Sequence, residues 1–311
     1  MARPLRINIA GGLFHIMQRG NARQRIFLSD RDRHAFLERL ARCSRLFECR
    51  IHAYCLMENH LHLLVETEKP NLSAFAQRLF ASYTLWFNHR HDRVGHLLQG
   101  RFKSIIVEKD AYLLVLSRYI HLNPVKARLV ERPEQYRWSS MGSYSPAGRR
   151  DNWVDPSTLL AYFDGSRERY RTFVYEGIEE PFEPKPIGQA FLGSDRFVER
   201  MRATATEEDG QARRDSSGHA LCAAASGERL LQAVEQEFHV GMPVLRSPNV
   251  RSREFAEAKA VAAYLLRQHT PLTFREIGQL LGHISGQAVE RAVRRVTTSP
   301  GLQKRAKRLI R

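Results

Sequence analysis

The chain has 311 residues, of which 43% are apolar, so it can bury at least one hydrophobic core and form about two domains. Lys and Arg number 49 against 33 Asp and Glu, giving a net charge of +16. This excess favours a polyanionic partner, although a merely basic protein is the alternative. No apolar run of about 18 residues or apolar N-terminal signal occurs, which argues against a membrane protein and predicts a cytoplasmic, nucleoid-associated one.

Strands and helices alternate along the first 125 residues. Segments with the corresponding periodicities follow in chain order. They are strand 13–19, helix 30–47, strands 50–57 and 60–66, a helix that Asn71 and Ser73 open and that runs through 74–90, strand 101–108 and helix 110–122. The order β-α-β-β-α-β with one further helix predicts an α+β, ferredoxin-like fold. In such a fold helices cover one face of the sheet, and the other face is free to host a site.

The composition of the chain predicts four parts. They are a first domain over residues 1–145, an irregular extension packed on it over 146–201, a flexible linker over 202–227 and an all-α unit over 228–300. The linker is predicted because its residues are small or charged and show no apolar periodicity.

Two histidines stand out in the strand that begins at residue 60. Residues two apart share one face of a strand, so His60 and His62 project together while Leu61 and Leu63 project to the other side. Two neighbouring imidazoles can hold a divalent cation if a third ligand is supplied. A plain polar surface with no metal is the alternative reading of the same spacing.

The helix over 110–122 can supply a third group. Tyr119 and Asn123 are four residues apart, so a phenol and a carboxamide oxygen face the same spot. Pro124 is expected to end the helix there. The alternative for Tyr119 is a core tyrosine in line with Tyr112.

Three ordered blocks of sequence carry a family resemblance. FHIMQRGNARQRIF (14–27), HAYCLMENHLHLLVE (52–66) and the stretch from LLQGRFKSIIVE to RWSS (97–140) resemble the single-tyrosine transposases of the HUH class, in the branch associated with repetitive extragenic palindromes. The resemblance implies a ferredoxin-like fold, metal ligation by His60 and His62, and nucleophilic attack by Tyr119. It implies Asn123 as a third ligand.

One residue of the second block departs from the pattern. Relatives most often have a proline where this chain has Glu58. Counted along the strand, Glu58 falls on the side of the histidines, so a contact with the metal is an open alternative to a role in the turn.

The resemblance implies transesterification of single-stranded DNA at or near palindromic hairpins, with Mg²⁺ or Mn²⁺. Tyr119 would become linked to a 5′ phosphate and release a 3′ hydroxyl. No nucleotide cofactor is expected, in line with the absence of a G-x-x-x-x-G-K phosphate loop. Arg101, Lys103 and Arg118 are candidate phosphate contacts, with ordinary solvated charges as the alternative.

The C-terminal unit has the pattern of a helix-turn-helix. A capping box at Thr273–Glu276 opens one helix, Gly282 ends it, and a second begins near Ser285. A generic helical hairpin is the alternative. Candidate DNA contacts on the second helix are Gln287, Arg291, Arg294 and Arg295.

The stretch 230–296 is similar to the C-terminal DNA-binding domain of the bacterial replication initiator DnaA. The segment HISGQA (283–288) differs from that family's recognition segment. We therefore expect duplex binding without recognition of the initiator's own DNA box.

These features together favour a transposase-like DNA transesterase, a single-strand nickase and ligase that its second domain tethers to duplex DNA. A non-catalytic DNA-binding regulator derived from a transposase is the alternative. A zinc-dependent hydrolase, which would activate water and form no covalent adduct, is a third possibility.

Overall fold

The computed structural model describes residues 7–179, 182–248, 252–270 and 272–309, without the side chains of residues 205–226. It divides into two compact units, 1–209 and 210–311, and each has its own hydrophobic core. No helix in these described ranges is long and apolar enough to cross a membrane.

Unit 1 is built on a five-stranded sheet with the order β2-β3-β1-β4-β5. Its strands are β1 (Gly12–Arg19), β2 (Cys49–Leu56), β3 (His60–Thr67), β4 (Lys103–Val107) and β5 (Phe191–Leu192). The first four pair antiparallel, and β5 adds in parallel to β4. The α+β, ferredoxin-like prediction is confirmed, because β1 lies between β3 and β4 as that arrangement requires.

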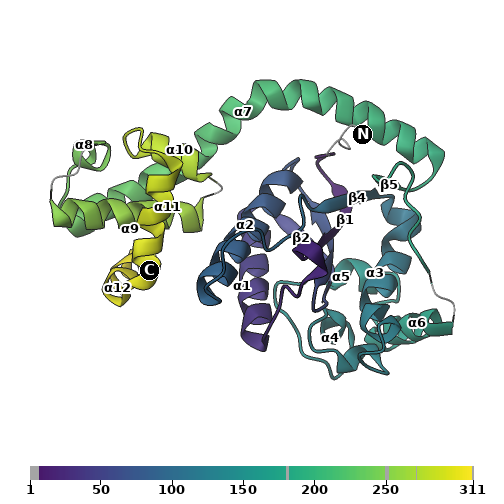
Figure 1. Ribbon diagram of the computed structural model, residues 1–311. Coiled ribbons are helices and arrows are strands. Elements are labelled where there is room, and N and C mark those ends of the chain that lie inside the picture. The colour runs from purple at the N-terminus through teal and green to yellow at the C-terminus, as the bar shows by residue number, and fades with distance from the viewer. Residues whose placement is uncertain (1–6, 180–181, 249–251, 271, 310–311) are drawn as a thin grey trace. The chain divides into compact units, whose positions relative to one another are not determined.

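Helices lie on both sides of this sheet (Figure 1). Those after β1 and β3, α1 (Asp30–Leu46) and α2 (Leu72–Arg90), pack together on one side. The helix after β4, α3 (Lys109–Lys126), packs against β2 and β3 on the other. The face that the sequence left free for a site is therefore partly covered by α3.

α3 does not end at Pro124 as predicted, since it continues to Lys126 with the proline inside. Proline has no amide hydrogen to donate to the carbonyl of Ile120, so the helix continues with one backbone hydrogen bond fewer. The amides of Ala127 and Arg128 still donate to the last carbonyls, those of Asn123 and Val125. Tyr119 and Asn123 consequently lie on consecutive turns of one helix.

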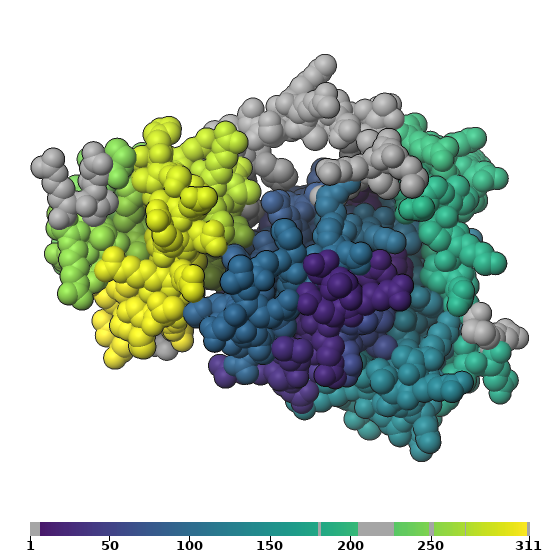
Figure 2. All heavy atoms as spheres, in the orientation of Figure 1, coloured from purple at the N-terminus to yellow at the C-terminus, as the bar shows by residue number. Residues whose placement is uncertain are grey.

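The chain after α3 forms short elements and shares the core of unit 1. They are η2 (Pro133–Gln135), α4 (Met141–Tyr144), α5 (Ser157–Ala161) and α6 (Arg167–Glu179), and a 3-10 turn, η1 (Asn21–Arg23), follows β1. Leu160, Tyr170 and Val174 belong to the same buried cluster as the sheet. Residues of this stretch, coloured teal, form one continuous body with those of the sheet domain in Figure 2.

A buried polar network attaches this stretch to α3. His121 is fully buried, and its Nδ1 and Nε2 hydrogen-bond to the Tyr170 and Ser140 hydroxyls at 2.9 and 2.8 Å. The Tyr170 hydroxyl also donates to Ser117 Oγ. His121 thus lies in the packing between α3 and α6, apart from the ring of Tyr119.

The segment predicted as a flexible linker, 202–227, has a helical backbone inside α7 (Asp195–Phe238). Its side chains over 205–226 lie outside the described residues. Alanine, glutamate, glutamine and arginine favour helix even without an apolar face, so a missing periodicity did not exclude this outcome.

Unit 2 is helical. After α7 come α8 (Met242–Leu245), α9 (Arg253–His269), α10 (Phe274–Leu280), α11 (Gly286–Thr298) and α12 (Pro300–Arg308). The Thr273–Glu276 capping box is confirmed, and α11 begins where the second helix was expected, with Ser285 as its N-cap. Gly282 has a φ of +90°, and a Cβ there would lie 1.9 Å from the Arg246 carbonyl oxygen, which explains the glycine in this turn.

Candidate active site

The register of the sheet aligns several polar residues on the face under α3. His62 of β3 lies opposite Met17 of β1, which in turn lies opposite Lys103 of β4. His60 lies opposite Arg19, the last residue of β1. Residues directly opposite one another share a face of a sheet, so two histidines and two exposed cationic side chains meet at one end of it.

Tyr119 reaches this end of the sheet from α3. Its ring centroid is 5.7 Å from that of His62, which is 5.2 Å from that of His60. The structure therefore brings together the three side chains that the sequence singled out on β3 and α3.

A fourth ring, that of His15, completes the cluster. It stacks on His62 with centroids 5.2 Å apart, and His15 Nε2 and His62 Nδ1 share a hydrogen bond of 2.9 Å. It also meets the Tyr119 ring edge to face at 6.1 Å.

Hydrogen bonds occupy the same nitrogen in both β3 histidines. His60 Nδ1–H donates to Asn59 Oδ1 at 2.7 Å, and the Asn59 amide is oriented by its own donation to the Arg23 carbonyl. His62 Nδ1 is engaged by His15. In each ring Nε2 is the nitrogen that remains for a ligand.

Burial keeps these histidines neutral. It lowers the pKa of His15 to about 3 and lowers that of His60. Burial, together with the neighbouring histidines, holds the pKa of His62 well below its usual value. Neutral imidazole is the form that binds metal ions.

The phenol of Tyr119 is held in its protonated form. Burial raises its pKa, the carboxylate of Glu183 raises it further, and the Asn123 side chain opposes them. Lys126 Nζ lies 4.9 Å from the ring centroid, and Phe182 meets the ring at 6.5 Å. Deprotonation of this phenol at neutral pH therefore needs help within the site.

Two separate regions of the chain are similar to known proteins. Residues 9–123 match the family model described as "Transposase IS200 like". Residues 228–296 match that described as "Bacterial dnaA protein helix-turn-helix". A solved structure of a REP-associated tyrosine transposase bound to a REP hairpin is similar over 50% of this chain and 96% of its own, at 18% identity and a TM-score of 0.40. No curated protein matches the chain.

Within the transposase-like region, residues 9–123, Asn123 is the last residue matched. Its Nδ2 donates to the backbone carbonyl of Tyr119 at 2.8 Å, and its carboxamide oxygen is the atom that can bind a cation. The described residues contain no group of three His, Cys, Asp or Glu side chains arranged for a metal. Two neutral imidazoles and this oxygen nevertheless suit a loosely held divalent cation with open positions.

Other residues discussed from the sequence lie differently. Both carboxylate oxygens of Glu58 accept from Arg25, at 2.6 and 3.1 Å, so Glu58 is bound to the loop after β1 rather than directed to the histidines. Arg118 stacks on Phe173 with its guanidinium carbon 4.6 Å from the ring centroid, inside unit 1. Arg101 is exposed in the turn before β4.

Sequence reasoning missed His15 and Arg19. In the strand predicted over 13–19 both lie on the same face as Met17, and the predicted topology puts that strand next to β3. These two points alone do not place His15 beside His62, because the register in which the two strands pair cannot be derived from them.

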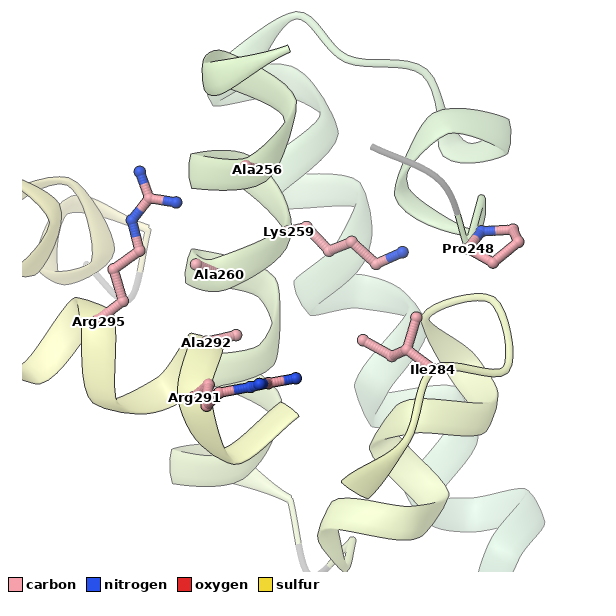
Figure 3. Close-up of a pocket in the computed structure, with 8 residues that line it drawn as sticks. All are labelled: Pro248, Ala256, Lys259, Ala260, Ile284, Arg291, Ala292 and Arg295. Atoms are coloured by element: carbon pink, nitrogen blue, oxygen red, sulfur yellow. The ribbon is translucent and has the colours of Figure 1, made fainter. Parts of the chain in front are cut away.

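The candidate DNA contacts of unit 2 lie on α11. The four candidate residues of α11, Gln287, Arg291, Arg294 and Arg295, are all exposed, while Val289 and Val296 are fully buried. Arg291 and Arg295 line a hollow of about 320 Å³ together with Lys259 of α9. In Figure 3 Lys259 and Arg291 extend to the same side, toward Pro248 and Ile284, while Arg295 extends away from Lys259.

Proposed function

We propose that unit 1 cuts and rejoins single-stranded DNA, with Tyr119 as the nucleophile and with His60, His62 and Asn123 as ligands of Mg²⁺ or Mn²⁺. The observation that carries the proposal is the 5.7 Å approach of the Tyr119 ring to a histidine pair whose Nε2 atoms are left for a ligand. The match of residues 9–123 to IS200-like transposases supports it.

The reaction balances without a cofactor that supplies energy. The Tyr119 hydroxyl loses its proton as its oxygen attacks a backbone phosphorus, the bond from phosphorus to the 3′ oxygen breaks, and the departing 3′ oxygen takes up one proton in exchange. The phosphotyrosine keeps the bond energy, so a 3′ hydroxyl can later reverse the step and rejoin DNA.

The residues of the chain have separate tasks in this step. The cation, when bound, polarises the phosphate oxygens and stabilises the charge of the transition state. Asn123 lowers the pKa of the phenol against the effect of burial. Arg19 and Lys103 lie exposed at the same end of the sheet, where they can hold the phosphates on either side of the scissile one.

We further propose that unit 2 binds duplex DNA through α11, with Gln287 and the three arginines on its exposed side. The match of residues 228–296 to the DnaA helix-turn-helix supports this. Palindromic hairpins, which combine a duplex stem with single strands, are the substrate that the sequence resemblance suggests for the whole chain.

A covalent adduct tests the first proposal. The wild-type protein, mixed with labelled single-stranded hairpin DNA and Mn²⁺, is expected to give a protein-linked species on a denaturing gel. Tyr119→Phe should abolish it. Tyr112→Phe is the matched control, because Tyr112 is on the same helix and meets the same Phe182 ring.

Each other result of that experiment has a definite meaning. An adduct that persists in Tyr119→Phe would exclude this nucleophile. Cleavage without an adduct would indicate a hydrolase that activates water, and binding without cleavage would indicate a DNA-binding regulator.

A further inference from the structure

His15 lies beside the proposed metal ligands without belonging to them. Its side chain is 1% exposed, stacked on His62 and hydrogen-bonded to His62 Nδ1 through its own Nε2. Its other nitrogen, Nδ1, is buried without a hydrogen-bond partner in the described part of the chain. A buried polar atom left in this state calls for an explanation.

Two neutral arrangements can form the hydrogen bond between these rings. In one, His15 Nε2–H donates to His62 Nδ1, and the proton of His62 is on Nε2. In the other, His62 Nδ1–H donates to His15 Nε2, and His62 Nε2 keeps its lone pair. Only the second arrangement leaves His62 able to bind a cation.

We propose that His15 is a positioning residue, which accepts the Nδ1 proton of His62 and so keeps the lone pair of His62 Nε2 available to the divalent cation. This inference rests on the function proposed above. Asn59 performs the same task for His60 through its carboxamide oxygen, so each ligand has its own acceptor.

The unpartnered nitrogen is a cost of this role. When His62 donates, the proton of His15 must be on Nδ1, where it lies buried without an acceptor among the described residues. A buried donor without an acceptor lowers the stability of the fold, so this arrangement needs a compensating gain. Cation binding is what favours the arrangement with His62 as donor.

Metal affinity provides the first test. Mn²⁺ binding to the full-length protein, measured by titration calorimetry, should weaken about 10- to 100-fold in His15→Leu, as when other partners of metal-bound histidines are removed. His15→Gln, which can place an oxygen near the position of Nε2, should stay close to wild type. His52→Leu is the matched control, because His52 is also a buried histidine of this sheet but contacts Glu66.

The protonated nitrogen provides the second test, and it does not depend on a variant folding. In the Mg²⁺-bound wild type, ¹⁵N-histidine NMR should find the proton of His62 on Nδ1. Finding it on Nε2, or finding wild-type Mn²⁺ affinity in folded His15→Leu, would overturn the inference. Neither result touches the adduct at Tyr119, so failure here is distinguishable from failure of the proposed function.

Discussion

Lys103 and Arg118, both predicted from the sequence as phosphate contacts, have different surroundings. Lys103 is exposed and aligned with His62 across β1. Arg118 is half-buried, stacked on Phe173, and its Nη1 donates to the carbonyl of that residue. The first is free to meet a phosphate, and the second is occupied in holding α6 to α3.

This difference predicts opposite results for two matched substitutions. Lys103→Gln should remove one phosphate contact, so the slope of log affinity against log salt for single-stranded DNA should become shallower by about 0.7. Arg118→Gln should leave the slope unchanged and lower the unfolding temperature, because a cation–π contact is lost. Salt titrations and thermal melts of both proteins check this, and a slope change in Arg118→Gln alone would contradict it.

Single residues were predictable where the strand or helix periodicity and the family resemblance pointed to the same residue. The two-residue repeat of β3 puts His60 and His62 on one face, and Tyr119 of α3 lies against that face. His15 could not be found in this way, since its meaning depends on which strand pairs beside it. The turn position of Glu58 hid its bond to Arg25, a contact over 33 residues.

At the scale of elements, two contacts fix how α3 lies along β3. Lys109 Nζ lies 2.7 Å from Glu66, and ten residues later Tyr119 meets His62. Ten helical residues span about 15 Å, and the four strand residues from Glu66 to His62 span about 13 Å. The helix therefore runs back along β3, and the ion pair at one end helps place the phenol at the other.

Glu66 gives this contact a pH dependence. The hydrogen bond from His52, together with Lys109, lowers the pKa of Glu66 from 4.5 to about 2. A carboxyl whose pKa is lowered by folding stabilises the fold above pH 4.5 and loses that effect as the pH falls toward 2. Glu66→Gln should thus be less stable than wild type above pH 5, and the difference should shrink between pH 4.5 and 2.

Urea unfolding over this pH range measures the difference. Glu68→Gln is the control, because Glu68 is 48% exposed and its ion pair with Arg50 should contribute little at any pH. A Glu66→Gln deficit that stays constant down to pH 2 would mean that the carboxylate charge is not what anchors α3.

Helices and strands were predictable from the local pattern of apolar residues, but less so where tertiary packing opposes a local sequence signal. The β-α-β-β-α-β order follows from segments of strand periodicity and helix periodicity that alternate along the chain. Pro124 was expected to end α3, but the packing of α3 on the sheet outweighs one lost hydrogen bond. The helical backbone of 202–227 was missed because helix propensity, without an apolar face, leaves no periodicity.

At the scale of the whole molecule, the two DNA-binding surfaces proposed above belong to two units with separate cores. A change on one surface should therefore leave the other working. Linked modules also raise each other's effective concentration, so a DNA that offers both a duplex and a single strand should bind more tightly than either part alone.

A pair of substitutions on α11 tests this division. Arg291→Gln with Arg294→Gln should make the salt slope for duplex binding shallower by about 1.8, because roughly 0.9 is lost for each phosphate contact. The Tyr119 adduct with a short single strand should form at the wild-type rate, since no residue of β1, β3 or α3 changes. The gain in affinity from joining duplex and single strand, roughly 10²- to 10⁴-fold in linked systems, should disappear.

Tyr119→Phe should show the reverse, with duplex binding kept and the adduct lost. Loss of both activities in either variant, if the variant is folded, would contradict two independent surfaces.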